Sequence, residues 1–234
     1  MWESIQNQLK EKLICENQIS DKIKYIGGVD ISFIKGDLIN ACSCLIVLDV
    51  ESLEIVYEKC NLIKLVEPYI PGFLAFREVN HFVELIDELK NNQPELLPDV
   101  IFVDGNGILH HKGFGLACHL GVLTEIPTIG IGKSLLCIDG LCKKNIKQQF
   151  IKCKNAGDFV PLVGESKKIW GVAIKTKKIV TNPIYVSIGH KIDLQKSIEL
   201  TLKYSKYRIP EPVRLADIIS RKYLVKLALV KFYR

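Results

Sequence analysis

Three strand-like runs follow one another near the start of this chain, and they constrain its fold more than any other feature. The runs cover residues 25–33, 39–48 and 53–63, and they are joined by short links that contain Lys35-Gly36-Asp37 and Val50-Glu51-Ser52. Short polar links of this kind are typical of hairpins. The sequence therefore predicts an antiparallel meander.

Helices and buried strands alternate in the rest of the chain. The expected elements are a polar helix over 1–20, a helix from residue 77, a strand at 100–103, a helix at 115–123, a strand at 128–131, short strands and basic loops over 134–190, and helices at 193–204 and 212–231. No internal repeat or low-complexity linker divides the chain, so residues 1–234 are expected to form a single domain. A meander followed by such alternation indicates an α/β fold with a mixed sheet flanked by helices. This order matches the ribonuclease H-like arrangement, although the pattern alone permits others.

Charge is distributed unevenly along the chain, although the net charge is only +6. Residues 1–132 hold 10 Lys/Arg and 19 Asp/Glu, whereas residues 133–234 hold 22 Lys/Arg and 7 Asp/Glu. An acidic half joined to a basic half suggests carboxylate chemistry beside a surface that binds a polyanion. Two solvated faces that differ in charge would give the same pattern.

Neither a membrane span nor a signal peptide is predicted. The apolar runs are far shorter than the roughly 20 residues of a spanning helix, and the polar start lacks the apolar segment of a signal peptide. The 8 cysteines form no C-x-x-C pair, and residues such as Cys42 and Cys44 are expected to be free buried thiols. We therefore expect a reducing compartment, the cytoplasm, with the nucleus as the alternative. A monomer is expected as well.

Two carboxylates stand at strand positions where acidic residues are uncommon. Asp30 lies inside the first strand and shares a face with Gly28 and Ser32. An acid in mid-strand is unfavourable unless something compensates for its desolvation. Asp104 ends the buried run 100–103, at the carboxyl end of a strand where the sites of α/β sheets gather. The structural alternatives are a solvent-facing Asp30 and a turn-forming Asp104.

Glu78 and Asp217 extend this set to four acidic residues. Each lies beside the apolar stripe of a predicted helix, although a helix N-terminus could explain Glu78 and a boundary position could explain Asp217. Four unpaired carboxylates packed together would repel one another and bind protons, and divalent cations remove that repulsion. Mg²⁺ prefers carboxylates together with water and phosphate oxygens, and paired ions support phosphodiester cleavage. With the basic half, a metal-dependent nuclease is the leading class.

Five segments, in order along the chain, resemble the endonuclease V family. They are G-V-D-I-S-F (28–33), P-Y-I-P-G-F-L-A-F-R-E (68–78), D-G-N-G-I-L-H (104–110), G-I-G-K (130–133) and R-I-P-E-P-V-R-L-A-D (208–217). The second segment is highly specific, whereas D-G-x-G alone would be a weak signal. The resemblance covers nearly the whole chain.

The resemblance implies a ribonuclease H-like fold and Mg²⁺-dependent hydrolysis of inosine-containing nucleic acid, with Mn²⁺ as an alternative ion. The cut would fall at the second phosphodiester bond 3′ to inosine and leave a 3′-hydroxyl and a 5′-phosphate. Carried over by motif, the metal ligands would be Asp30, Asp104 and Asp217. Glu78 would complete the acidic cluster, and Lys133 would stabilise charge on the cleaved phosphate unless it is a plain solvated lysine.

The resemblance also implies a pocket for a hypoxanthine base flipped out of its strand. Tyr69 fits a wedge that stacks in the gap left by the base, with Pro71 restraining the backbone. The residues that match the family's pocket segments are Gly72, Leu74, Gly105 and Gly107, with His110 nearby. A packed turn at Tyr69 and turn geometry at the glycines are the alternatives, and a glycine with positive φ could also line a pocket.

The run H-H-K-G-F-G (110–115) resembles the eukaryotic branch of the family, which favours inosine in RNA over DNA. The expected partner is therefore inosine-containing RNA, with deaminated DNA as a second candidate, and a contact to the ribose 2′-hydroxyl would be the physical basis. Two other functions stay open: a non-catalytic protein that binds inosine-containing RNA, and another ribonuclease H-like enzyme such as a hybrid nuclease or junction resolvase. The intact acidic set argues against the first, and the segment 68–78 argues against the second.

Overall fold

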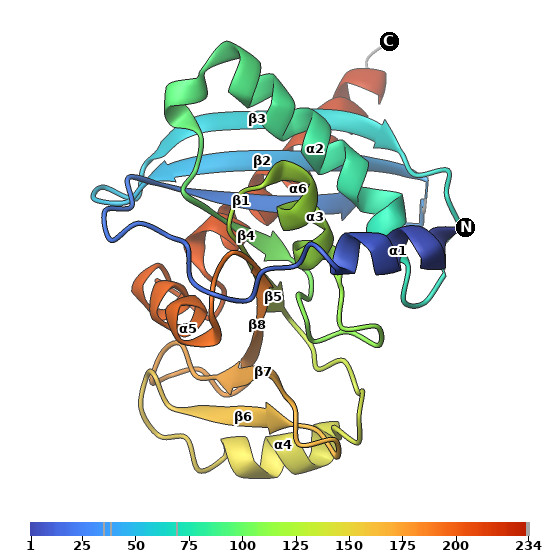
Figure 1. Cartoon of the computed structure of the whole chain (residues 1–234). Helices are drawn as coiled ribbons and strands as arrows, with labels where there is room; N and C mark the ends of the chain where they lie inside the picture. Colours follow the sequence, from blue (N-terminus) through green and yellow to red (C-terminus); the bar gives the residue numbers. More distant parts are fainter. Residues whose placement is uncertain (35, 38, 69, 233–234) are drawn as a thin grey trace.

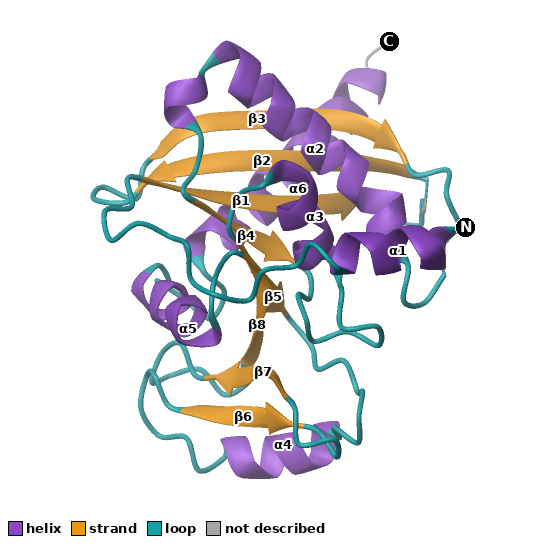
Figure 2. Ribbon diagram, viewed as in Figure 1, coloured by secondary structure: helices purple, strands orange, loops and turns teal. Residues whose placement is uncertain are grey.

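The computed structural model describes residues 1–34, 36–37, 39–68 and 70–232, whose strands form one eight-stranded mixed sheet (Figures 1 and 2). The order across the sheet is β3-β2-β1-β4-β5-β8-β7-β6. The strands are β1 (Tyr25–Phe33), β2 (Asn40–Asp49), β3 (Ile55–Lys64), β4 (Val100–Asp104), β5 (Thr128–Gly132), β6 (Phe159–Val163), β7 (Ile169–Ile174) and β8 (Ile184–His190).

The predicted meander is confirmed, and it places β1 against the centre of the sheet. β1 pairs antiparallel with β2, which pairs antiparallel with β3. On its other side β1 runs parallel to β4, and β4 runs parallel to β5. Val29 of β1 lies level with Val103 of β4, which lies level with Gly130 of β5. The chain therefore leaves β4 and β5 at the edge of the sheet where β1 also approaches its carboxyl end.

Helices cover both faces of the sheet, so the expected α/β class with a ribonuclease H-like mixed sheet is confirmed. On one face lie α2 (Leu74–Asn92) and α3 (Leu116–Thr124), and on the other lie α5 (Leu194–Lys203) and α6 (Glu211–Phe232) (Figure 1). The remaining helical segments are α1 (Trp2–Lys10), α4 (Lys143–Phe150) and a 3-10 turn at Pro94–Leu96.

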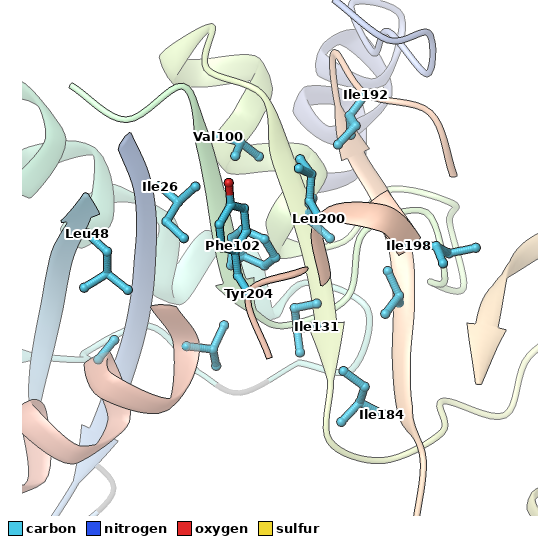
Figure 3. Packing of buried hydrophobic residues seen from close by; sticks show 14 of the residues in the cluster. Ile26, Leu48, Val100, Phe102, Ile131, Ile184, Ile192, Ile198, Leu200 and Tyr204 are labelled. Carbon is cyan, nitrogen blue, oxygen red and sulfur yellow. The ribbon is translucent and has the colours of Figure 1, made fainter. Parts of the chain in front are cut away.

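Alternate residues of the central strands fill two separate cores. Val29 and Val103 pack beneath α2 and α3, whereas Ile26 and Phe102 pack beneath α5 and α6. Figure 3 shows Phe102 beside Tyr204, and their ring centroids are 6.4 Å apart at a right angle. Neighbouring residues of a strand point to opposite faces of the sheet. Every second residue of β1 counted from Ile26, including Asp30, therefore lies on the face that α6 covers.

Gly28 has no side chain, and this lets α6 approach β1 closely. A Cβ at Gly28 would lie 2.2 Å from the carbonyl oxygen of Pro212, near the start of α6. Any larger residue would push the helix off the strand. The face of β1 that carries Asp30 is therefore closed by the helix that carries Asp217.

The structure corrects the predicted helix boundaries. The first helix ends at Lys10 rather than near residue 20, because the following segment joins the end of β8: the Lys191 amide donates to the Ile14 carbonyl at 2.7 Å. The second helix begins at Leu74, three residues before Arg77. The helix α4 lies where only strands and loops were expected, and it buries only Ile146 and Phe150, a signal too short to stand out among lysines.

No helix in the described part of the chain has the length and hydropathy that crossing a bilayer requires. The eight cysteines are free thiols, and Cys42 and Cys44 are buried as predicted.

Candidate active site

Three carboxylates from three different elements converge at the edge of the sheet. Asp30 comes from β1, Asp104 from the last position of β4 and Asp217 from α6. Each offers one oxygen that lies within 4.8 Å of the oxygens offered by the other two. The parallel register of β1 and β4 places Asp30 beside Asp104, and the close approach of α6 adds Asp217. Hard divalent cations prefer such a set of oxygen donors.

Asp30 is the most buried member of the cluster, with 3% of its surface exposed. The solvent-facing alternative is therefore wrong. The Ser32 hydroxyl lies 3.1 Å from Asp30 Oδ2, and the Ser220 hydroxyl lies 3.2 Å from the same oxygen. Burial, together with the neighbouring Asp104 carboxyl, raises the pKa of Asp30 to about 8. A cation at this position would favour the charged form.

Lys133 already neutralises part of the cluster. Its Nζ lies 2.5 Å from Asp104 Oδ2 and 3.6 Å from Asp217 Oδ1. Partial burial lowers the pKa of this ammonium group, but the surrounding carboxylates, Asp104 first, outweigh burial and raise it overall. Lys133 directly follows β5, and Arg208 Nη2 donates to the Lys133 carbonyl oxygen at 2.7 Å. Lys133 is thus a held cation at the site rather than a plain solvated lysine.

Glu78 lies close to the cluster but outside the group of three. It is 9% exposed on α2, and burial raises its pKa to about 7, with a smaller raising contribution from Asp104 and an opposing one from Arg77. Because α2 begins at Leu74, Glu78 is in the second turn and the first turn carries no acidic residue. A contact with the helix N-terminus therefore does not explain Glu78.

Asp217 is the most accessible of the three carboxylates, with a side chain 25% exposed. Arg221, one turn further along α6, donates to Asp217 Oδ1 from Nε at 3.1 Å and from Nη2 at 2.9 Å. The cluster therefore opens to solvent on the side where Arg221 and Lys133 stand. An anion approaching from that side meets positive charge before it meets the carboxylates.

The predicted pocket residues lie on two segments that adjoin the acidic cluster. Pro71 and Gly72 lead into α2, which begins at Leu74 one turn before Glu78, and Gly105 directly follows Asp104. The glycines differ in what they require. Gly72 has a φ of +86°, whereas Gly105 and Gly107 are not among the residues with positive φ. At Gly107 the constraint is space, because a Cβ there would lie 1.8 Å from the Ile188 carbonyl oxygen.

His110 is half-buried in the middle of the second loop, which runs from Asp104 at the end of β4 to Leu116 at the start of α3. Burial lowers its pKa to about 4, and the neighbouring His111 and Lys10 act in the same direction. The imidazole is therefore neutral near pH 7, and its Nδ1 accepts a hydrogen bond from the Lys112 amide at 3.3 Å. The predicted wedge Tyr69 lies outside the described residues.

Several supporting residues escaped the sequence prediction. Ser220 contacts Asp30, Arg208 holds the backbone of Lys133, and Gln6 donates hydrogen bonds to both pocket loops. Serine, arginine and glutamine are common on helix surfaces and loops, so residue type alone does not indicate that these three residues support the site. For Ser220, the place three residues after Asp217 on an apolar stripe was the one usable signal.

Comparisons with known proteins point to one family. The family profile described as Endonuclease V matches residues 7–218. Endonuclease V of Homo sapiens is 46% identical over 205 residues, which cover 87% of this chain and 73% of that protein. Endonuclease V of Mus musculus is 44% identical over 232 residues, covering 96% of this chain and 69% of that protein.

Solved structures agree with the sequence matches. The crystal structure of human ENDOV has a TM-score of 0.94 and 42% identity, and covers 97% of this chain and 98% of its own. Ciona intestinalis endonuclease V, solved with a 24mer DNA containing an inosine followed by a ribo-adenosine, has a TM-score of 0.91 and 38% identity, with 97% of each chain covered. Sequence, fold and the converging carboxylates lead to one assignment: this chain belongs to the endonuclease V family of nucleases.

Proposed function

We propose that the protein is an inosine-directed endoribonuclease. It hydrolyses the second phosphodiester bond 3′ to inosine in single-stranded RNA and leaves a 3′-hydroxyl and a 5′-phosphate. The observation that carries this proposal is the convergence of Asp30, Asp104 and Asp217, with Lys133 beside them, in a chain of the endonuclease V family. DNA containing deaminated adenine is the second candidate substrate.

The Ciona intestinalis relative supports the choice of substrate. That protein was solved with DNA containing an inosine followed by a ribo-adenosine. The nucleotide after the inosine therefore carries a 2′-hydroxyl, the group that distinguishes RNA from DNA at a given position. We extend recognition of this 2′-hydroxyl to the present chain, whose H-H-K-G-F-G run at 110–115 resembles the eukaryotic branch of the family.

Mg²⁺ fits the donor set, and Mn²⁺ is the alternative. The three cluster residues offer oxygen donors only, and no cysteine or histidine belongs to the group among the described residues. Such a set suits a hard divalent ion better than a soft one. When bound, the ion supplies positive charge for the attacking and leaving oxygens of phosphodiester hydrolysis. Asp30, Asp104 and Asp217 would hold it.

The other residues of the site orient the substrate and balance charge. Lys133 Nζ is already held beside two carboxylates, and its positive charge would attract the scissile phosphate. Glu78 completes the acidic cluster. The loops with Pro71, Gly72, Leu74, Gly105, Gly107 and His110 would enclose the hypoxanthine, whose 6-oxo group and N1–H distinguish it from adenine.

The decisive experiment is a cleavage assay with matched strands. Single-stranded RNA and DNA of one sequence, each with one inosine or with adenosine in its place, are incubated with the wild-type protein and with Asp30→Asn, with Mg²⁺ and with EDTA. We expect cleavage only with inosine and metal, faster for RNA, and none by Asp30→Asn. Sequencing of the product ends gives the position of the cut.

Each other outcome contradicts a defined part of the proposal. Binding of inosine strands without cleavage would make the protein a non-catalytic inosine-RNA binder. Equal cleavage of adenosine strands would make it a general nuclease. Faster cleavage of the inosine DNA than of the inosine RNA would make DNA the preferred substrate. Cleavage in EDTA would remove the metal from the mechanism.

The proposal includes a monomer that acts in the cytoplasm, with the nucleus as the alternative. Free thiols in all eight cysteines are compatible with a reducing compartment. Fluorescence microscopy of a tagged chain and light scattering of the purified protein test the two statements.

A further inference from the structure

The first helix lies outside the sheet and packs on both segments that carry the predicted base pocket. Figure 1 shows α1 beside the start of α2 and close to α3. The Trp2 ring stacks on Phe76, with ring centroids 5.3 Å apart and an angle of 8° between the planes. Trp2 also contacts Phe73 at 6.2 Å between centroids. The helix is thus fixed to the loop that leads into α2.

Gln6 connects this loop to the second pocket loop. Its side-chain Nε2 donates to the Gly72 carbonyl oxygen at 3.1 Å and to the Phe114 carbonyl oxygen at 3.2 Å. These partners lie 66 and 108 residues away in the sequence. Gln6 is only 1% exposed and is the buried residue of an otherwise polar helix. One buried amide therefore ties together two backbone segments that share no strand or helix.

Two further contacts hold α1 on the second loop. Lys10 Nζ donates to the Lys112 carbonyl oxygen at 2.6 Å, and Lys112 Nζ lies 2.5 Å from Glu3 Oε1. Both contacts are exposed, where ion pairs contribute little. Gln6 is the buried contact, and buried carbonyl groups that lose their donor are costly to leave unpaired. Among the contacts of α1, Gln6 therefore supplies the buried hydrogen bonds that link the two loops, beside the packing of His119 on Phe76 and Phe114.

We infer that Gln6 is a positioning residue for base recognition, and that α1 fixes the width of the hypoxanthine pocket. This inference rests on the proposed function. Gly72 lies on one predicted wall of the pocket, and His110 lies four residues before Phe114 on the other. A pocket that accepts hypoxanthine must hold its walls at a fixed separation, since recognition requires hydrogen-bond distances on both sides. Gln6 sets that separation without touching the base.

The inference predicts an effect on binding rather than on the chemical step. The metal ligands Asp30 and Asp104 are held by strands and by α6, none of which contacts Gln6 in the hydrogen bonds described above. Loss of the Gln6 contacts would let the loops separate while the carboxylates stay in place. Substrate affinity should fall, whereas turnover of bound substrate should change little.

The test compares Gln6→Met with Gln8→Met. Methionine has a similar length to glutamine but donates no hydrogen bond, and Gln8 is an exposed residue on the same helix. For single-stranded RNA with one inosine, we expect Gln6→Met to raise KM by about tenfold, as two lost hydrogen bonds would. We expect its kcat to stay within about twofold of wild type, and Gln8→Met to match the wild type in both constants.

Two further measurements guard against a trivial loss of folding. Hydrogen exchange of Gln6→Met should rise in segments 70–76 and 110–116 and stay unchanged in β1. Trp2→Ala removes a half-buried ring from the same helix, so it should fold even where Gln6→Met does not, and it should also raise KM more than it lowers kcat. Affinity for the adenosine strand should not change in either variant.

The outcomes separate this inference from the proposed function. If the wild-type protein cleaves no inosine strand, the proposed function fails. If the wild type cleaves but Gln6→Met and Trp2→Ala show its KM, the inference alone is overturned. A fall in kcat with unchanged KM would also overturn it, because Gln6 would then act on the chemical step.

Discussion

The hydroxyl of Ser220 on α6 lies 3.2 Å from Oδ2 of Asp30 on β1, although 190 residues separate the two in the sequence. Ser220 is fully buried, and its oxygen also lies 2.7 Å from the hydroxyl of Ser32. The helix that closes this face of the sheet thus supplies both a carboxylate, Asp217, and a hydroxyl that contacts the carboxylate opposite. Residues that orient metal ligands in this way strongly affect metal affinity.

Ser220→Ala should therefore weaken metal binding without removing a ligand. We expect the Mg²⁺ concentration that gives half-maximal cleavage to rise by about 10- to 100-fold. A titration of the cleavage rate with Mg²⁺ measures this, with Ser4→Ala at an exposed serine of α1 as the control. An unchanged midpoint would show that the Ser220 contact does not orient Asp30.

Lys133→Met should slow catalysis and destabilise the metal-free protein. Lys133 stands beside Asp104 and Asp217, so its loss removes a charge aimed at the phosphate and exposes two carboxylates to each other. We expect kcat to fall by about 100- to 1,000-fold, as when a preorganised electrostatic donor is removed. The metal-free protein should also melt at a lower temperature than the wild type.

The matched control is Lys144→Met, at an exposed lysine of α4. Single-turnover cleavage and thermal unfolding in EDTA measure the two effects. A Lys133→Met protein with wild-type kcat would place its charge outside the reaction.

The sequence predicts those parts of the site that local patterns determine. Asp104 ends one short buried strand and Lys133 follows another, and the carboxyl ends of such strands lie where the sites of α/β sheets gather. Asp30 was recognised as unusual, but its burial depends on α6, which packs on β1 through Gly28. No local pattern around residue 30 contains that information.

The supporting contacts were beyond prediction for the same reason. Gln6 and Ser220 act through partners more than 60 residues away, so only the packed structure reveals them. The helix α1 was predicted as too long because its hydrophilic pattern continues past Lys10, whereas pairing with the end of β8 stops it.

Glu78→Gln should stabilise the metal-free protein at alkaline pH. Burial raises the pKa of Glu78 from 4.5 to about 7, so the folded state holds a proton that the unfolded chain releases. The stability contributed by that proton is complete below pH 4.5 and is lost as the pH rises to 7. Glutamine carries no such titration, so the variant avoids a loss of at most about 3 kcal/mol.

Thermal unfolding in EDTA at pH 5 and pH 8 tests this prediction. The variant should melt above the wild type at pH 8, by up to roughly 10 °C, and close to it at pH 5. Glu84→Gln, at an exposed position of the same helix, should show no difference. Cleavage by Glu78→Gln should fall, because the acidic cluster loses a charge. If Glu78→Gln and the wild type melted at the same temperature at both pH values, an unfavourable burial of ionised Glu78 would be contradicted.

Divalent metal should stabilise the protein more at pH 8 than at pH 5.5. In the metal-free protein burial raises the pKa of Asp30 from 3.8 to about 8, so at pH 5.5 the folded state keeps a proton on this ligand. That proton stabilises the folded state at low pH, and the stabilisation is lost as the pH rises towards 8. A metal ion must displace it, so the proton competes with the ion more strongly at pH 5.5 than at pH 8. In EDTA the melting temperature should decrease from pH 5.5 to pH 8. Saturating Mg²⁺ should restore it mainly at pH 8, where a hundredfold excess over Kd raises the free energy of unfolding by about 3 kcal/mol.

Asp30→Asn removes both the titration and the ligand, so its melting temperature should respond weakly to Mg²⁺ at either pH. An equal Mg²⁺ response of wild type and Asp30→Asn would show that the ion binds elsewhere.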